Sequence, residues 1–100
     1  MDIKQKKDGK TVTVAVSGRI DTVTAPEFEA FVKQNIGDCT SLVLDFKKVN
    51  YVSSAGLRVL LSMQKKMDKI GDMKLINVDE SVTDVFEVTG FDEILTYEKG

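Results

Sequence analysis

Histidine and tryptophan are absent from this chain of 100 residues, and cysteine and proline occur once each, as Cys39 and Pro26. Without histidine, the chain lacks both the commonest general base and the commonest metal ligand. A lone cysteine forms no internal disulfide, which favours a reducing compartment. No apolar run approaches the ~18–20 residues of a membrane span. We therefore expect a cytoplasmic protein with no metal site and no membrane segment.

The charges are nearly balanced, since 14 Lys and Arg face 16 Asp and Glu for a formal net charge of −2. This balance gives no indication of the basic surface that nucleic acid needs, so we expect no direct nucleic-acid partner. Apolar residues make up 42% of the chain, enough to bury one core. We expect a single domain over residues 1–100, and a monomer, because nothing in the composition calls for self-association.

Hydrophobic periodicity predicts strands that alternate with helices. Asp8-Gly9 is a strong hairpin-turn signal, and the later glycines mark helix ends. The predicted order is β-β-α-β-α-β-α-β: an α/β fold with a mostly parallel β-sheet, one antiparallel N-terminal hairpin strand and about three helices. The expected strands are 3–7, 11–17, 41–46, 73–78 and 94–97, and the expected helices are 24–36, 54–70 and 81–89.

Two adjacent serines, Ser53 and Ser54, stand between an apolar strand and an apolar helix. The free N–H groups at a helix N-terminus and the helix dipole both favour a negative charge there. A phosphate suits such a position, either as a bound ligand or attached to a serine. The alternative is that a serine hydroxyl simply caps the helix, which is worth about 0.5–2 kcal/mol.

Catalytic motifs are missing from the chain. A hydrolase elbow needs Gly-x-Ser-x-Gly and a histidine, whereas the serine turn reads Val52-Ser53-Ser54-Ala55-Gly56. Asp21 and Asp45 fall near predicted strand ends and could approach this turn, but turn and cap chemistry is the favoured interpretation without a third ligand. Neither glycine-rich phosphate-loop pattern is present. We expect no enzyme activity and no cofactor.

Four segments in this order give the chain a recognisable pattern: 17–21 (SGRID), 42–45 (LVLD), 51–57 (YVSSAGL) and 85–91 (VFEVTGF). The chain resembles a STAS domain, and more narrowly a stand-alone bacterial anti-sigma factor antagonist. The resemblance implies partner switching. The unphosphorylated antagonist binds an anti-sigma factor that is also a serine kinase, and so releases the sigma factor. Phosphorylation ends this association, and a serine phosphatase restores it.

The resemblance also implies roles for single residues. Ser54 matches the phosphoacceptor, and Asp21 matches an acidic residue close to it. Gly56 and Leu57 match the start of the helix that helps form the partner surface. Ser53 stands where many members have Asp, which makes it part of that surface and the second candidate for the acceptor.

Functions of other classes remain as alternatives. The chain would keep this fold as a STAS interaction module of another bacterial signalling assembly, without sigma-factor control. It would also keep the fold as a carrier of a small ligand at the helix terminus, or as a hydrolase that uses Ser54.

Overall fold

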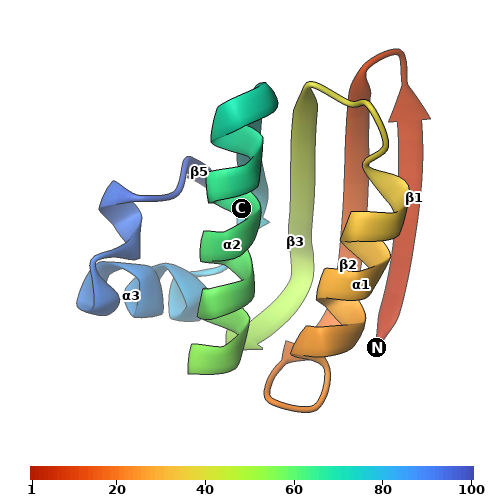
Figure 1. The fold of residues 1–100 in the computed structure, drawn as a ribbon. Coiled ribbons are helices and arrows are strands. Elements are labelled where there is room, and N and C mark those ends of the chain that lie inside the picture. Colours follow the sequence, from red (N-terminus) through yellow and green to blue (C-terminus); the bar gives the residue numbers. More distant parts are fainter.

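The computed structural model describes all 100 residues. They form a five-stranded sheet in the order β1-β2-β3-β4-β5, together with three helices and one 3-10 turn (Figure 1). This confirms the predicted fold class and element order. In chain order the elements are β1 (Asp2–Asp8), β2 (Thr11–Ile20), α1 (Ala25–Asn35), β3 (Ser41–Val52), α2 (Ser54–Ile70), β4 (Asp72–Val78), α3 (Glu80–Thr89), η1 (Phe91–Glu93) and β5 (Tyr97–Lys99).

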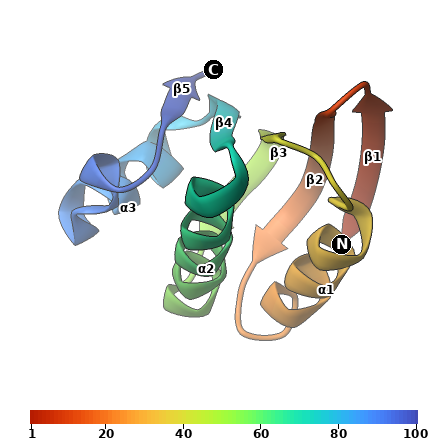
Figure 2. The ribbon, with the colours of Figure 1, turned by 45° about the horizontal axis from the view of Figure 1, so that its top comes forward.

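The sheet is parallel except at one edge. β1 pairs antiparallel with β2, while β2–β3, β3–β4 and β4–β5 are parallel pairs. Each parallel pair is joined by a helix, and the strands follow one another across the sheet. Right-handed crossovers that all advance in the same direction place their helices on the same face. Figures 1 and 2 show α1 and α2 against that face, with α3 beside α2 toward β4 and β5.

The strand sequences match this one-sided cover. Val12, Val14 and Val16 of β2 are at most 2% exposed, whereas Ala15 between them is exposed. In β3, Leu44 is fully buried and Val43 is half-buried on the opposite face. Side chains alternate between the two faces of a strand, so one set packs under the helices and the other faces outward. The core is one cluster of 25 buried residues.

Strand β3 is twice as long as predicted and ends at Val52 rather than near residue 46. The pairing of β2 with β3 shifts between Ala15 and Ser17 and again between Gly18 and Arg19. At each shift β3 carries one extra residue, which breaks its period-two pattern. Lys47 and Lys48 are therefore both exposed, and the sequence pattern ends before the strand does.

Other boundaries differ from the prediction too. Strand β2 continues to Ile20 instead of ending at residue 17, because its pairing with β3 resumes after each register shift. Helix α3 begins at Glu80 instead of residue 81, because Asp79 is its N-cap: the Asp79 carboxylate accepts a hydrogen bond from the Val82 N–H at 3.0 Å. The last strand lies at Tyr97–Lys99 instead of 94–97. The 3-10 turn and the buried Leu95 occupy the intervening chain, and only then does β5 meet β4.

The one-sided cover predicts unequal effects of truncation at adjacent positions of β3. Leu44→Ala leaves a cavity under the helices and should lower the free energy of unfolding by about 2–5 kcal/mol. Val43→Ala, on the bare face, should cost about 1 kcal/mol or less. Urea unfolding of both variants measures the difference, and equal losses would show that both faces are covered in solution.

Candidate functional site

The carboxyl ends of β2 and β3 bring two loops together at one edge of the sheet. Ile20 pairs with Val52, and the Ser53 N–H then donates to the Ile20 carbonyl at 2.8 Å. The chain after Ile20 leads through Asp21 into α1, and the chain after Ser53 enters α2 directly. The serine turn and the β2–α1 loop are therefore neighbours. In open α/β sheets, ligands bind at this carboxyl edge.

The two serines have different surroundings. Ser53 is the N-cap of α2: its backbone is extended (φ −84°, ψ 175°) and its Oγ accepts a hydrogen bond from the Gly56 N–H at 3.3 Å. Ser54 is the first residue of the helix, its side chain is exposed, and its hydroxyl makes no hydrogen bond within the chain. The capping interpretation of the turn thus applies to Ser53, and the hydroxyl of Ser54 is left free to react or bind.

Gly56 and Leu57 hold the start of α2 against the sheet. Gly56 is buried, and a Cβ at this position would lie 2.8 Å from Cγ2 of Ile20 and 2.9 Å from Cγ1 of Val52. Leu57 is 7% exposed and belongs to the core. Gly56 has no side chain and that of Leu57 is buried, so neither residue offers a free side chain to a partner. They act on the site by placing Ser54 at the edge.

The loop after β2 is organised by Asp21. Its Oδ1 accepts hydrogen bonds from the N–H groups of Val23 and Thr24, both at 3.0 Å. The Thr24 hydroxyl accepts from the Asp21 N–H at 2.9 Å and donates to the Arg19 carbonyl at 2.6 Å. Thr24 and Glu27 have the sequence spacing of a capping box, which predicts that Thr24 caps α1, but this prediction is wrong because Thr24 makes no side-chain cap bond to the helix. Its hydroxyl is used within the loop.

Asp21 is a firmly ionised group at this edge. The hydrogen bond from the Thr24 N–H is the largest influence that holds the pKa of Asp21 below its usual range, and the Thr24 hydroxyl, the Val23 N–H and Arg19 act in the same direction. Burial opposes these effects and is the weaker influence overall. At neutral pH the loop therefore carries a fixed negative charge.

Sequence reasoning missed a pair of residues beside the serine turn. Arg19 and Tyr51 are partners in the β2–β3 register, and the guanidinium carbon of Arg19 lies 4.1 Å from the centroid of the Tyr51 ring. Arg19 Nε is also 3.8 Å from Asp21 Oδ2. The side chain of Tyr51 is 40% exposed and that of Val23 is 83% exposed. The second register shift aligns Arg19 with Tyr51, and the sequence holds no signal for that shift.

A family model for the STAS domain matches residues 2–99 of this chain. The chain belongs to the STAS domain family. Among curated proteins, an anti-sigma factor antagonist by name, BtrV of Bordetella bronchiseptica, is 32% identical over 88 residues, covering 86% of this chain and 75% of that protein. The anti-sigma-B factor antagonist of Bacillus subtilis is 29% identical over 96 residues, covering 95% of this chain and 86% of that protein.

Solved structures of similar proteins superpose on nearly the whole of this chain. An anti-sigma factor antagonist from Mycobacterium paratuberculosis superposes with a TM-score of 0.88 at 25% identity, covering 99% of this chain and 86% of that one. The antagonist SpoIIAA in its unphosphorylated form superposes with a TM-score of 0.75 at 16% identity, covering 99% and 89%. At that lower identity the likeness shows the fold alone.

Asp45 does not belong to the site of this STAS domain, so the prediction that it could approach the serine turn is wrong. Seven residues of β3, 46–52, lie between it and Ser53, which at about 3.3 Å per residue puts the two more than ~20 Å apart. Asp45 instead accepts hydrogen bonds from the Lys47 N–H at 3.0 Å and from Asn77 Nδ2 at 3.1 Å. The prediction assumed that β3 ended near residue 46, whereas the bulged strand continues past it.

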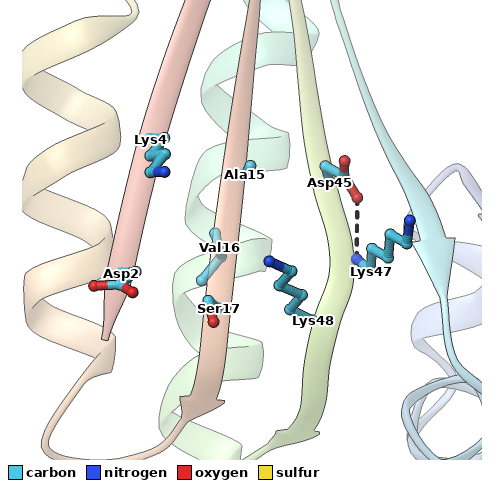
Figure 3. Close-up of a pocket in the computed structure, with 8 residues that line it drawn as sticks. All are labelled: Asp2, Lys4, Ala15, Val16, Ser17, Asp45, Lys47 and Lys48. Atoms are coloured by element: carbon cyan, nitrogen blue, oxygen red, sulfur yellow. Dashed lines mark hydrogen bonds between the residues drawn. The ribbon is translucent and has the colours of Figure 1, made fainter.

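The bare face of the sheet holds a separate shallow hollow of about 160 Å³ around Ala15 (Figure 3). Its side chains carry both signs of charge: Asp2 and Lys4 come from β1, and Asp45, Lys47 and Lys48 come from β3. It contains no set of ligands that matches one class of small molecule. The three helices, for their part, lack the length and hydropathy that crossing a membrane requires.

The division of roles between the two serines predicts different effects on stability. Ser53→Ala removes the N-cap of α2 and should lower the free energy of unfolding by about 1 kcal/mol. Ser54→Ala removes an exposed, unbonded hydroxyl and should change it by less than about 0.5 kcal/mol. Parallel urea titrations compare the two, and an equal loss in both would contradict the assignment of the cap to Ser53.

The close approach at Gly56 predicts a loss in the variant Gly56→Ala. Overpacking against Ile20 and Val52 should cost about 1–3 kcal/mol. The higher helix propensity of alanine should return about 1 kcal/mol of this. We expect a net loss of about 1 kcal/mol, by thermal and urea unfolding. Ser62→Ala, at an exposed position of the same helix, is the control and should be close to neutral. A stabilised Gly56→Ala would refute the close approach.

Proposed function

We propose that this STAS domain is an anti-sigma factor antagonist controlled by phosphorylation of Ser54. The observation that supports this most directly is the free, exposed hydroxyl of Ser54 at the start of α2, next to a serine that already provides the cap. The relatives from Bordetella bronchiseptica and Bacillus subtilis are named as antagonists of anti-sigma factors, which supports the partner class. SpoIIAA, a structural relative, is known in a phosphorylated form.

In the proposed cycle the unphosphorylated domain binds an anti-sigma factor that is also a serine kinase, and the sigma factor is released. The kinase transfers the γ-phosphoryl group of ATP to Ser54 Oγ, leaving ADP, and the complex dissociates. A serine phosphatase hydrolyses the phosphoserine and restores the binding form. The domain contributes the acceptor rather than the catalysis, and we propose that it acts as a monomer in the cytoplasm.

Phosphorylation should change the surface of the domain more than its fold. The phosphate adds a charge of about −1.5 to −2. At the first residue of α2 it faces free N–H groups and the positive end of the helix dipole, so the helix is not weakened. The cost falls on the complex, where the interface formed around a small hydroxyl and an unpaired charge would have to be buried.

The proposed partner surface combines the hydroxyl with exposed apolar side chains on both sides of it. Tyr51 is the second-last residue of β3, just before the serine turn, and Val23 lies in the loop held by Asp21. Aromatic residues in such positions are enriched at the centre of protein interfaces. Because Ser53 stands where many family members have Asp, we propose that the carboxylate of Asp21 supplies the negative charge beside the acceptor. The buried Gly56 and Leu57 contribute by fixing the position of α2.

Phosphosite mapping tests the proposal. The wild type, Ser53→Ala and Ser54→Ala are incubated with ATP and lysate of the native host, and each is analysed by mass spectrometry. A single phosphate that disappears only in Ser54→Ala is the expected result. Loss only in Ser53→Ala would move the acceptor. No phosphate, in lysate with an active serine kinase of this type, would leave an unphosphorylated interaction module of another signalling assembly.

Partner affinity should follow the charge at position 54. Ser54→Asp should weaken binding of the anti-sigma factor about a hundredfold, since burial of an unpaired charge costs several kcal/mol. Ser54→Ala should bind as tightly as the unmodified protein and resist phosphorylation. Isothermal titration calorimetry measures both, and an unchanged affinity of Ser54→Asp would contradict the switch.

A further inference from the structure

Only two of the cationic residues in the chain are arginines. Arg19 pairs with Tyr51 just before the serine turn, and Arg58 follows the turn within α2. Arg19 is already engaged, since it stacks on Tyr51 and lies 3.8 Å from a carboxylate oxygen of Asp21. Arg58 is exposed, takes part in none of the five ion pairs of the structure and donates no side-chain hydrogen bond. A guanidinium group without a partner is therefore available in the second turn of α2.

Helical spacing places this free guanidinium over Ser54. Residues i and i+4 lie on the same helix face, with Cβ atoms about 5–6 Å apart. An acidic group that precedes a basic one at this spacing is the favoured order on a helix. Ser54 and Arg58 have this spacing and order within α2 as soon as Ser54 carries a phosphate.

The space beside Arg58 is open enough for a phosphate. A hollow of about 240 Å³ lies between α1 and α2, and Ala55, Arg58 and Val59 form its α2 side. Arg58 is the only cationic residue that lines it. The acidic residue that lines the hollow, Glu29, forms an ion pair with Lys33 at 3.6 Å and forms none with Arg58. Ser54 does not line this hollow but directly precedes Ala55, which does. A phosphate on its exposed hydroxyl would therefore have an unpaired guanidinium one helical turn away, beside open space.

We propose that Arg58 is the intramolecular partner of the phosphate on Ser54, so that the phosphorylated domain holds its own phosphate in a contact between the first and second turns of α2. The inference rests on the proposed function, because it concerns the modified form of Ser54. The planar guanidinium donates two parallel hydrogen bonds to phosphate oxygens, a geometry that a lysine cannot reproduce. Together with the N–H groups at the helix start, Arg58 stabilises the switched-off form without help from a partner.

Two measurable effects follow from this contact. A cation next to the phosphate favours the dianion, so it lowers the second pKa of the phosphoserine below its usual value of about 6. The contact also adds a favourable charge pair to α2. At pH values above that pKa, the phosphorylated protein should therefore melt about 2 °C higher than the unmodified protein. As the pH falls through the pKa, the phosphate loses one charge and the thermal gain should shrink.

The test uses the full chain with phosphoserine placed at position 54 during translation, so that no kinase is needed. Phosphorus NMR follows the phosphate through a pH titration in the otherwise wild-type chain and in the variants Arg58→Gln, Arg58→Lys and Lys66→Gln. We expect Arg58→Gln to raise the pKa of the phosphate by about 0.5 and to abolish the thermal gain. In Arg58→Lys the phosphate pKa and the thermal gain should lie between those of the wild type and those of Arg58→Gln. Lys66→Gln removes the same unit charge from an exposed position about three turns further along α2 and should leave both readouts near the wild-type values.

Equal pKa values in the wild type and Arg58→Gln would overturn the inference. Equal shifts in Arg58→Gln and Lys66→Gln would also overturn it, because they would report the net charge rather than a contact. These results are independent of the phosphosite mapping in host lysate. If Ser54 is not a substrate there but Arg58→Gln shifts the phosphate pKa, the proposed function fails and the contact stands. If Ser54 is a substrate but no shift is found, the contact alone fails.

Discussion

The contact of helix α2 with the ends of β2 and β3 is the constraint on which the candidate site depends. Gly56 lets the helix backbone come so close to Ile20 and Val52 that no side chain fits between them. With the helix seated there, Ser53 can both continue the β2–β3 pairing through its N–H and cap the helix through its hydroxyl. Ser54 is consequently the first side chain to leave the sheet edge, and it points into solvent.

The one-sided architecture accounts for the position of the candidate site at an edge of the sheet. Helices cover one face of the sheet, and the bare face of β1–β3 carries a mixture of charges with no consistent sign (Figure 3). At the carboxyl edge, by contrast, a fixed carboxylate, a free hydroxyl, an exposed tyrosine and two arginines lie close together in the fold. The strands and helices of the core serve chiefly to hold these groups in place, because each comes from the end of a regular element.

The proposed phosphorylation of Ser54 would change the charge of this surface without disturbing the hydrogen bonds that hold the fold. The hydroxyl that stabilises the helix belongs to Ser53, whereas the hydroxyl available for modification belongs to Ser54. Asp21 is likewise fixed by hydrogen bonds within its own loop, so its charge does not depend on a partner. Changes at Ser54 can therefore alter what binds while the supporting hydrogen bonds remain intact.

The amino-acid sequence by itself determined the fold class and the serine turn, because both follow from local patterns. The alternation of valines in β2, the spacing of apolar residues in α2 and the glycines at helix ends are readable without any knowledge of distant contacts. The serines between a strand and a helix likewise indicate a helix N-terminus. The family resemblance rests on the same local segments.

Tertiary structure alone decided which serine caps the helix, where β3 ends and which side chains surround the site. The bulges in β3 shift its pairing with β2, and this shift brings Arg19 over Tyr51 and leaves Asp45 far from the turn. Such shifts depend on how two strands distant in sequence fit together under the same helices. The role of Thr24 was also decided there, because the carbonyl of Arg19 and the N–H of Asp21 compete successfully with the helix for its hydroxyl. Local propensity reports none of these contacts, since each is set by the packing of separate elements against one another.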